Sequence, residues 1–218
     1  MYIPSTFAEP RLDVMHAFVR AHPFATLVTD DGEAPYASHI PMHLHVDDEH
    51  PNGVLTAHVS RANPHWKLAA IERASLVVFS GAHAYISPSW YPGKATHHRE
   101  VPTWNYSIVH AWGRLETFDD PVALLRNLND LTDAREAHRA TRWRVSDAPD
   151  DYVRTQLRGI VGLRLVIDRI EGKWKLGQNR TPEDRLGAAT GLMTEGDERE
   201  RAVGAAMHDA PDRSGGQR

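Results

Sequence analysis

The chain has 218 residues, of which 41% are hydrophobic and 25% charged, with a formal net charge of −4 at pH 7. This composition is that of an ordinary globular protein, and the acidic balance argues against a duplex-DNA binder, whose affinity comes mainly from basic side chains on phosphates. The absence of cysteine excludes disulfides, thiolate metal sites and cysteine nucleophiles. Since neither a signal peptide nor an apolar membrane span is present, we expect a cytoplasmic protein.

Hydrophobic periodicity and turn residues predict a succession of strands interrupted by a few helices. The hairpin signal Asp31-Gly32 and the helix starts Asn63-Pro64, Asp120-Pro121 and Thr181-Pro182 mark the boundaries. In chain order we expect a helix (11–21), strands (24–29, 35–40, 42–46 and 54–60), a helix (63–74), strands (76–79, 84–87 and 108–118), helices (from 120 and around 152–157), one bent strand or two strands broken near 171–172 (160–176), and a helix from 181.

The order of these elements indicates the fold class. Strands come in consecutive groups instead of alternating with helices, which favours an α+β fold with a mostly antiparallel barrel over a doubly wound sheet. Residues 92–105 form a long polar segment, expected to be a functional loop. From residue 194 to 218 the chain is polar and without periodicity, so we expect one domain over 1–193 and a disordered tail over 194–218.

The stretch from His58 to Trp66 has the composition of an anion-binding site. A strand end delivers His58 and Ser60, Arg61 follows, and a helix begins at Asn63. Free N–H groups at a helix N-terminus and a guanidinium fork can together hold a phosphate dianion. The alternative is that Arg61 pairs with a nearby carboxylate and that Asn63 only caps the helix.

The stretch from Ala84 to Lys94 places hydroxyls, aromatic rings and an ammonium at the exit of a strand. Aromatic faces suit a planar ligand, while hydroxyls and an ammonium suit its polar arms. An aromatic corner that packs against a turn would explain the same residues. The candidates for a binding role are Ser87, Trp90 and Lys94.

Two further stretches have a similar character. In the first, Thr103 and Asn105 flank Trp104 in an expected loop, where they could contact the hydrogen-bonding edge of a ring system; the alternative makes Trp104 a core residue. In the second, Lys173 and Lys175 share one strand face, and three polar residues precede the capped helix start. That stretch predicts a second anion-binding or dimer-crossing element, or else a solvated charged turn. Its three polar candidates are Gln178, Asn179 and Arg180.

Other site chemistries find little support. His43 and His45 share a strand face, and His97, His98 and Glu100 lie together in a loop, but neither group has the spacing of known zinc motifs, so we expect surface histidines and no metal. No G-x-S-x-G, G-x-G-x-x-G or Walker A sequence occurs. No side chain stands out as a general acid or base, and we predict no catalytic residue.

Six strings of the sequence resemble the PaiB family, also described as FMN-binding negative transcriptional regulators. The resemblance runs in order from Met1 to about Met193, with departures among small residues at Ala57, Ser60, Ala82 and Gly177. The strings are HPFATLVT (22–29), ASHIP (37–41), HVSRANPHW (58–66), VFSGAHAYISPSWY (78–91), VPTWNY (101–106) and EGKWKLGQNR (171–180).

The resemblance implies a split β-barrel, related to pyridoxamine-phosphate oxidases and flavin reductases, that forms a homodimer with FMN in a groove at the interface. It also implies a role for each candidate. Arg61 and Asn63 would serve the phosphate with His58 and Ser60 beside them; Ser87, Trp90 and Lys94 would line the flavin or its ribityl chain; Thr103, Trp104 and Asn105 would face the ring edge; Gln178, Asn179 and Arg180 would reach in from the second subunit.

For function, the resemblance implies an FMN-binding protein, a flavin-dependent oxidoreductase with a negative transcriptional role. One alternative is a DNA-binding repressor without enzymatic activity, although no helix-turn-helix signature occurs and the net charge is acidic. The other is a haem-binding or haem-using enzyme on the same barrel, for which His39, His58 and His110 are weak candidates as axial ligands. Haem is thus the alternative cofactor to FMN.

Overall fold

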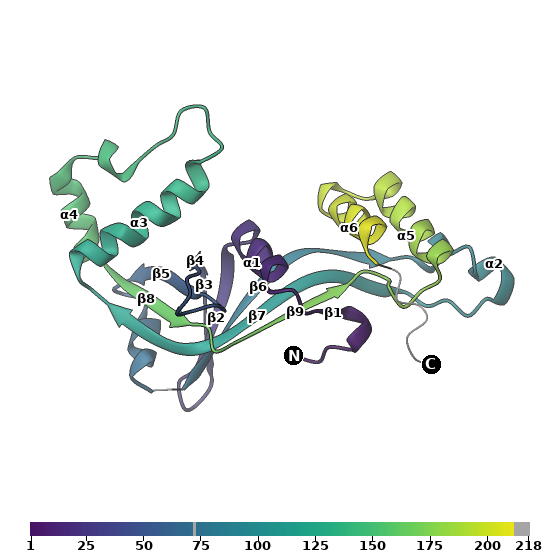
Figure 1. The fold of residues 1–218 in the computed structure, drawn as a ribbon, viewed down its shortest axis with the longest axis horizontal. Helices are drawn as coiled ribbons and strands as arrows, with labels where there is room; N and C mark the ends of the chain where they lie inside the picture. Colours follow the sequence, from purple (N-terminus) through teal and green to yellow (C-terminus); the bar gives the residue numbers. More distant parts are fainter. Residues whose placement is uncertain (72, 212–218) are drawn as a thin grey trace. The chain divides into compact units, whose positions relative to one another are not determined.

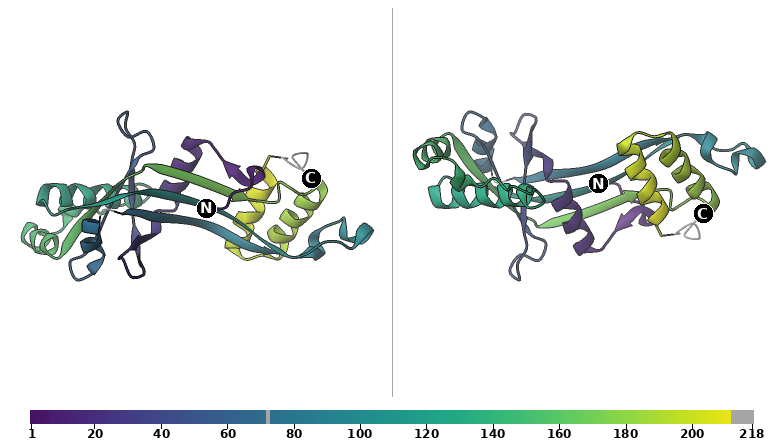
Figure 2. Two further views of the ribbon diagram at one scale, coloured as in Figure 1. Left: turned by 90° about the horizontal axis from the view of Figure 1, so that it is seen from below. Right: turned by 90° about the horizontal axis from the view of Figure 1, so that it is seen from above.

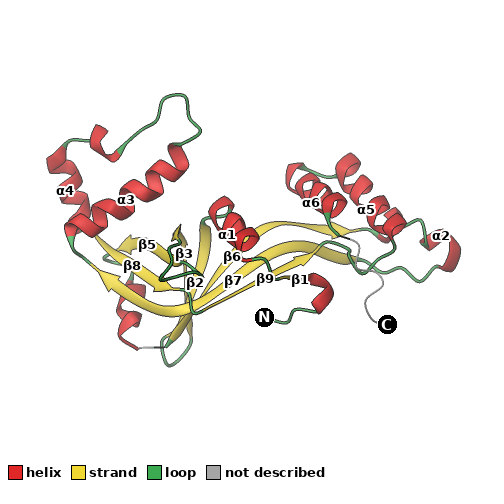
Figure 3. Ribbon diagram, in the orientation of Figure 1, coloured by secondary structure: helices red, strands yellow, loops and turns green. Residues whose placement is uncertain are grey.

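The computed structural model describes residues 1–71 and 73–211 (Figures 1 and 3). The helices are α1 (Leu12–Ala21), α2 (Lys94–His97), α3 (Pro121–Glu136), α4 (Asp150–Arg158), α5 (Pro182–Glu195) and α6 (Glu198–Asp209). The 3₁₀ helices are η1 (Ser5–Phe7), η2 (Pro64–Ile71), η3 (Pro88–Trp90) and η4 (Val145–Asp147). The strands are β1 (Ala8–Glu9), β2 (Phe24–Asp30), β3 (Pro35–Pro41), β4 (His43–His45), β5 (Val54–Ser60), β6 (Ala74–Ile86), β7 (Thr103–Phe118), β8 (Ile160–Val166) and β9 (Arg169–Lys175).

The strands are hydrogen-bonded in the order β3-β2-β6-β7-β8-β5-β4, and β9 pairs with β1 and β7. The α+β fold with antiparallel strand pairs confirms the predicted class. The chain forms two compact units. Unit 1 contains Met1–Met15, Ser80–Val109 and the chain from Glu171 on, and unit 2 contains His16–Phe79 and His110–Ile170. None of the helices within 1–71 and 73–211 is long and apolar enough to cross a membrane.

In unit 2, β2 and β3 form the hairpin that Asp31-Gly32 predicts. Gly32 has a φ of +100°, a conformation that residues with a Cβ rarely adopt. The Asp31 carboxylate accepts the main-chain N–H groups of Ala34 and Glu33 at 2.8 Å each, and these bonds lower the pKa of Asp31. The turn is therefore held by its own side chain.

The helix α3 positions much of the polar chemistry of unit 2. Its start is the predicted one: the Asp120 carboxylate accepts the N–H of Ala123 at 2.8 Å, and Pro121 occupies the first turn. Leu124 is buried, and α3 packs against α4, β4, β5 and β8. Side chains of α3 therefore face those of β4 and β5.

In unit 1, α5 and α6 lie side by side, as both views of Figure 2 show. Their apolar side chains form a core with Ala84, Ile86 and Tyr91. The buried guanidinium of Arg185, on α5, donates to the carbonyl of Met207 at 2.8 Å and to that of Ala210, at the end of α6. A buried arginine thus caps the carboxyl end of the last helix.

The prediction of a disordered tail over 194–218 is wrong for residues up to 211, because α6 is a packed helix. Val203 and Met207, one helical turn apart, are buried. Asp197 and Glu200 form a capping box, in which each side chain accepts the other's main-chain N–H. The signal was present in the sequence as Asp-x-x-Glu ahead of an apolar pair. Residues 212–218 lie outside the described part.

Three other boundaries differ from expectation. The two strands expected at 76–79 and 84–87 are one long strand, β6, which ends at Ile86. The strand β7 begins at Thr103, inside the segment expected to be a loop, and that segment also contains α2. The break in 160–176 falls between β8 and β9, at 167–168, and not at 171–172.

His65, in η2, is a fully buried residue of unit 2. Its Nδ1 lies 2.9 Å from Ser38 Oγ and its Nε2 2.9 Å from Thr29 Oγ1, which in turn lies 2.7 Å from Ser75 Oγ. Hydroxyls can donate or accept, so they satisfy both nitrogens of a neutral ring. Burial lowers the pKa of His65 to about 4.

We expect His65 to make unfolding easier in acid. Above its usual pKa of 6.5 the ring is neutral in both states; as the pH falls from there to about 4, only the unfolded chain takes up the proton. The free energy of unfolding should fall over this window by about 3 kcal/mol from this residue. Urea unfolding at pH 7, 5.5 and 4.5 measures it, and His65→Gln should show the shallower pH dependence. Equal slopes for the two proteins would contradict the assignment.

Candidate functional site

Three arginine side chains meet at a cavity of about 350 Å³ in unit 2, here called the arginine pocket. One comes from the turn after β5, two lie one turn apart on α4, and the first turn of α3 completes the wall. The lining residues are Arg61, Asp119, Pro121, Leu124, Arg154, Leu157 and Arg158.

The guanidinium of Arg61 is held by main-chain carbonyls. Its Nε donates to the carbonyl of Arg158 at 3.1 Å and its Nη2 to that of Ile160 at 3.0 Å, while its main-chain N–H donates to Gly159 at 2.8 Å. Among residues 1–71 and 73–211, no carboxylate forms an ion pair with Arg61. The alternative in which Arg61 pairs with a nearby carboxylate therefore finds no support.

The charges around the arginine pocket are unbalanced. Arg154 and Arg158 repel each other because like charges one helical turn apart are neighbours on the helix surface. Within the described part of the chain neither guanidinium has a hydrogen bond or ion pair, and Asp119 is the one carboxylate in the lining. The pocket is therefore suited to an anion that carries two charges.

The neighbours of Arg61 in sequence have other partners. Asn63 Oδ1 accepts the N–H of His65 at 3.0 Å, and its Nδ2 donates to Ser38 Oγ at 3.1 Å, so Asn63 caps η2. The exposed Ser60 accepts the N–H of Ala62 at 3.3 Å. Of the four residues expected at a phosphate, only Arg61 lines the arginine pocket.

A second cavity of unit 2, about 570 Å³, lies where α3 faces β4 and β5; we call it the histidine cavity. His58 lines it and its Nδ1 lies 3.0 Å from Asn127 Oδ1, on α3. His43 lines it as well, and burial together with the nearby His45 lowers the pKa of His43, so its ring is neutral near pH 7. Its other polar lining includes Arg20, Thr132, Arg135 and Glu136.

The three histidines considered for haem lie on three different strands. His39 is exposed on β3, and His58, on β5, contacts Asn127. His110, on β7, has its ring 5.5 Å from that of Trp112. Only His58 lines a cavity described here.

In unit 1, the strands β6 and β7 present exposed aromatic rings. Trp104 is 54% exposed and Tyr85 43%; their ring centroids are 6.1 Å apart, and His83 lies 5.7 Å from Trp104. Beside them is a cavity of about 340 Å³ that Trp104 and Tyr106 line. Trp104 is therefore not a core residue. We call His83, Tyr85 and Trp104 the aromatic face.

Thr103 and Asn105 point away from Trp104 because successive side chains of a strand alternate between its faces. Asn105 is buried, and its Nδ2 lies 3.2 Å from Met207 Sδ. Thr103 accepts from the Lys175 ammonium, which also donates to the Trp104 carbonyl at 2.6 Å. Burial, with Lys173 nearby, lowers the pKa of Lys175. The three neighbours that were expected to contact one edge of a ring system therefore lie on two different faces of the strand.

The remaining candidates of unit 1 mostly have structural partners. Ser87 accepts the N–H of Ser89 at 3.2 Å and caps η3. Trp90 donates from Nε1 to Glu195 at 3.2 Å, so the aromatic-corner interpretation fits it. Lys94 is exposed at the start of α2.

The stretch before α5 is also tied into unit 1. The buried Gln178 accepts the N–H of Leu176 at 2.8 Å and donates to the carbonyl of Trp174 at 2.7 Å. Arg180 pairs with Glu100 and lies 4.8 Å from the ring of Tyr91. Asn179 is exposed. A solvated charged turn does not describe this stretch.

Sequence reasoning missed Arg154 and Arg158. Both fall in or beside the helix predicted around 152–157, four residues apart, and like charges at that spacing repel on a helix face. Two arginines at this spacing could have been recognised as a candidate anion site from the sequence. The sequence does not show that Arg61 lies next to them.

Trp90 packs so closely on α5 that there is no room for a side chain at Gly191. A Cβ there would lie 2.4 Å from the Trp90 ring. We expect Gly191→Ala to lower the free energy of unfolding by about 1–3 kcal/mol, as overpacking does, measured by urea unfolding with tryptophan fluorescence. The exposed neighbour Thr190→Ala serves as control and should change it by less than about 0.5 kcal/mol. A neutral Gly191→Ala would show that Trp90 is not packed there.

Comparisons with known proteins show clear relatives. Residues 1–169 match the profile of the family described as "Putative FMN-binding domain". The Bacillus subtilis protein named Protease synthase and sporulation protein PAI 2 is 31% identical over 209 residues, which cover 96% of this chain and 97% of that protein. An uncharacterized protein of Aspergillus fumigatus is 29% identical over 242 residues, which cover 91% of this chain and 93% of that protein.

Solved structures share the fold. The FAD and haem binding protein from Mycobacterium smegmatis has a TM-score of 0.57 at 19% identity, covering 78% of this chain and 74% of that one. The flavocytochrome Anf3 from Azotobacter vinelandii has a TM-score of 0.55 at 15% identity, covering 78% and 70%. At such low identity these structures establish a common fold, and the ligands in their names belong to them.

Proposed function

This chain belongs to the PaiB family of FMN-binding proteins with a split-barrel fold, and from that premise we propose that the arginine pocket holds the phosphate of FMN. The observation that carries the proposal is the meeting of Arg61, Arg154 and Arg158 around one cavity with a single carboxylate, Asp119. A phosphate dianion would offset the excess of positive charge there.

The geometry of Arg61 supports this assignment. Two of its N–H groups are engaged by the carbonyls of Arg158 and Ile160, which fixes the plane of the guanidinium. A fixed fork loses less conformational entropy on binding than a mobile one. Arg154 and Arg158 extend from the adjoining helix and would complete the contacts to phosphate oxygens.

Bound FMN would supply redox chemistry, while the chain binds and orients it. We propose a flavin-dependent oxidoreductase with a regulatory role in the cytoplasm. The net charge of −4 favours regulation through the flavin or a small-molecule signal over direct contact with DNA. The other candidates for flavin contact, among them Ser87, Lys94 and Asn179, stay predictions.

The phosphate assignment predicts a difference between FMN and riboflavin, which lacks the phosphate. We expect wild type to bind FMN more tightly, and the double variant Arg154→Gln/Arg158→Gln to lose at least about 100-fold in FMN affinity, because each of the two charge-assisted hydrogen bonds contributes about 1.5–3 kcal/mol. Riboflavin affinity should change little. Titration followed by flavin fluorescence measures both.

Arg164→Gln is the control, since it makes the same substitution once at a surface pair with Glu116, away from the arginine pocket. It should leave both affinities unchanged. Equal losses for FMN and riboflavin in the double variant, or no preference of wild type for FMN, would contradict a phosphate site at the arginine pocket.

We also infer that the chain is a homodimer whose contact includes the aromatic face. Exposed tryptophan and tyrosine are enriched at protein interfaces because their rings bury much area at little conformational cost. Trp104 and Tyr85 lie together on unit 1, and Val101, three residues before Trp104 in the sequence, is 62% exposed. A second copy of the chain is the partner that the family resemblance favours.

We expect wild type to sediment as a dimer at micromolar concentration and Trp104→Ser to dissociate at least about 30-fold more readily, the effect of losing a hot-spot contact of about 2 kcal/mol. The measurement is sedimentation velocity across a concentration series. Trp143→Ser, in which a tryptophan of unit 2 that is 49% exposed is removed, is the control and should stay dimeric. A monomeric wild type would rule the interface out.

A further inference from the structure

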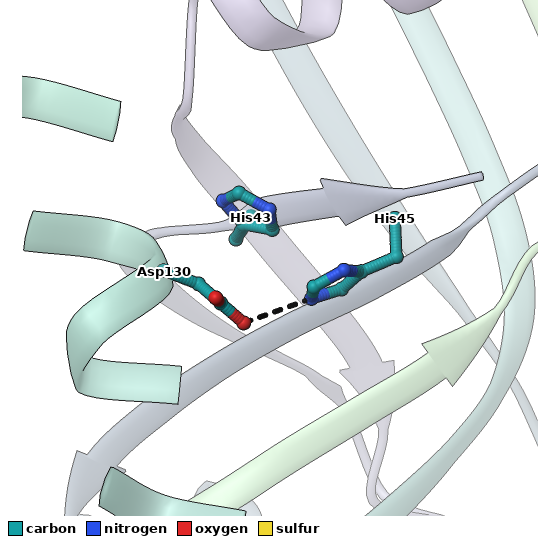
Figure 4. Close-up of side chains that lie close together, drawn as sticks. All are labelled: His43, His45 and Asp130. Carbon is teal, nitrogen blue, oxygen red and sulfur yellow. Dashed lines mark ion pairs between the residues drawn. The ribbon is translucent and has the colours of Figure 1, made fainter. Parts of the chain in front are cut away.

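Three metal-binding side chains converge where β4 faces α3. His43 and His45 are two residues apart on β4 and therefore lie on the same face of the strand. Asp130 approaches them from α3, as Figure 4 shows. One ligand atom from each residue lies within 4.8 Å of the others. From the sequence, the pair His43-x-His45 has no third ligand; the fold supplies it from a distant helix.

The spacing of these atoms suits a tetrahedral ion. Zinc lies about 2.0–2.2 Å from histidine nitrogen and carboxylate oxygen, which places neighbouring ligand atoms about 3.4 Å apart. His45 Nε2 and Asp130 Oδ2 are 3.3 Å apart. The rings of His43 and His45 lie with centroids 4.4 Å apart, tilted by 54°. The nitrogen of His43 lies within 4.8 Å of both other ligand atoms.

We propose that His43, His45 and Asp130 form a binding site for a divalent transition-metal ion of the zinc class. Two imidazoles and one carboxylate are the mixed nitrogen and oxygen donors that Zn²⁺ accepts, and a hard ion such as Mg²⁺ prefers oxygen alone. Three protein ligands leave one position open.

A cavity lies beside one of the three ligands. His43 lines the histidine cavity, and Arg20 and Arg135 line it too. The lining thus carries these two cations against one carboxylate, Glu136, which favours an anion, so a hydroxide or the carboxylate of a small molecule is the fourth ligand that the surroundings suit best.

A histidine–aspartate hydrogen bond without metal is the competing account of His45 and Asp130, yet it leaves other polar atoms at this interface unexplained. Thr56, which pairs with His43 across the β4–β5 ladder, has a buried Oγ1 without a hydrogen-bond partner in the described chain. The same holds for Nδ2 of the buried Asn127. A buried unsatisfied polar group costs about 1–3 kcal/mol, so a water or a small ligand that hydrogen-bonds to these two atoms would stabilise this interface.

The experiment is a titration of the full-length protein, after treatment with a chelator, with Zn²⁺ by calorimetry and with Co²⁺ by visible absorption. We expect one Zn²⁺ per chain, a tetrahedral Co²⁺ spectrum and a raised melting temperature with Zn²⁺, because an ion that binds the native state alone stabilises it. His45→Gln and Asp130→Asn should each weaken Zn²⁺ binding at least about tenfold.

Control variants distinguish Zn²⁺ binding at this site from Zn²⁺ binding to other histidines on the surface. His50→Gln removes a histidine from an exposed pair with Asp47 elsewhere in unit 2 and should leave Zn²⁺ affinity and stoichiometry unchanged. Circular dichroism reports whether the variants fold, and His43→Gln gives a third, independent removal of a ligand. Absence of stoichiometric Zn²⁺ binding, or equal affinity in wild type and the double variant His43→Gln/His45→Gln, would overturn the proposal.

Discussion

The hydrogen bonds from Arg61 to the carbonyls of Arg158 and Ile160 determine where the arginine pocket lies. The carbonyl of Arg158, the last residue of α4, lacks a partner within the helix, and the guanidinium donates to it and to the carbonyl of Ile160, the first residue of β8. The bonds therefore join the end of β5 to the end of the helix that carries Arg154 and Arg158. The same hydrogen bonds thus satisfy the last carbonyl of a helix and bring Arg61 next to Arg154 and Arg158. The position of Arg61 in the pocket is therefore fixed by the main chain around it.

Histidine has three different roles in unit 2, and the surroundings decide each one. His65 is enclosed by hydroxyls and stays neutral to about pH 4. His58 is oriented by an asparagine of α3. His43 and His45 meet a carboxylate from that helix. A large number of histidines in a sequence therefore does not indicate a common function.

The tryptophans of unit 1 show how local geometry separates packing from recognition. Trp90 lies against a helix glycine and bonds to Glu195, so it is a packing residue. Trp104 lies in a strand between two neighbours that point to the opposite face. Asn105 is buried in the core, and Thr103 accepts a hydrogen bond from Lys175. Alternation leaves the Trp104 ring on the outer face, where it is available to a partner.

The α+β class, the family, the Asp31-Gly32 hairpin and the capped starts of α3 and α5 could be predicted from the amino-acid sequence, because each depends on nearby residues or on long matching strings. The sequence also pointed to Arg61. The helix α6 was locally encoded by its capping box and buried pair, but the polarity of the tail concealed it. The folded arrangement was needed to choose between a capping and a phosphate-binding Asn63, to show that Asn105 is buried, and to bring Arg154, Arg158 and Asp130 next to residues far away in the chain. Contacts between distant segments depend on how helices pack on the sheet, and no local pattern contains that information.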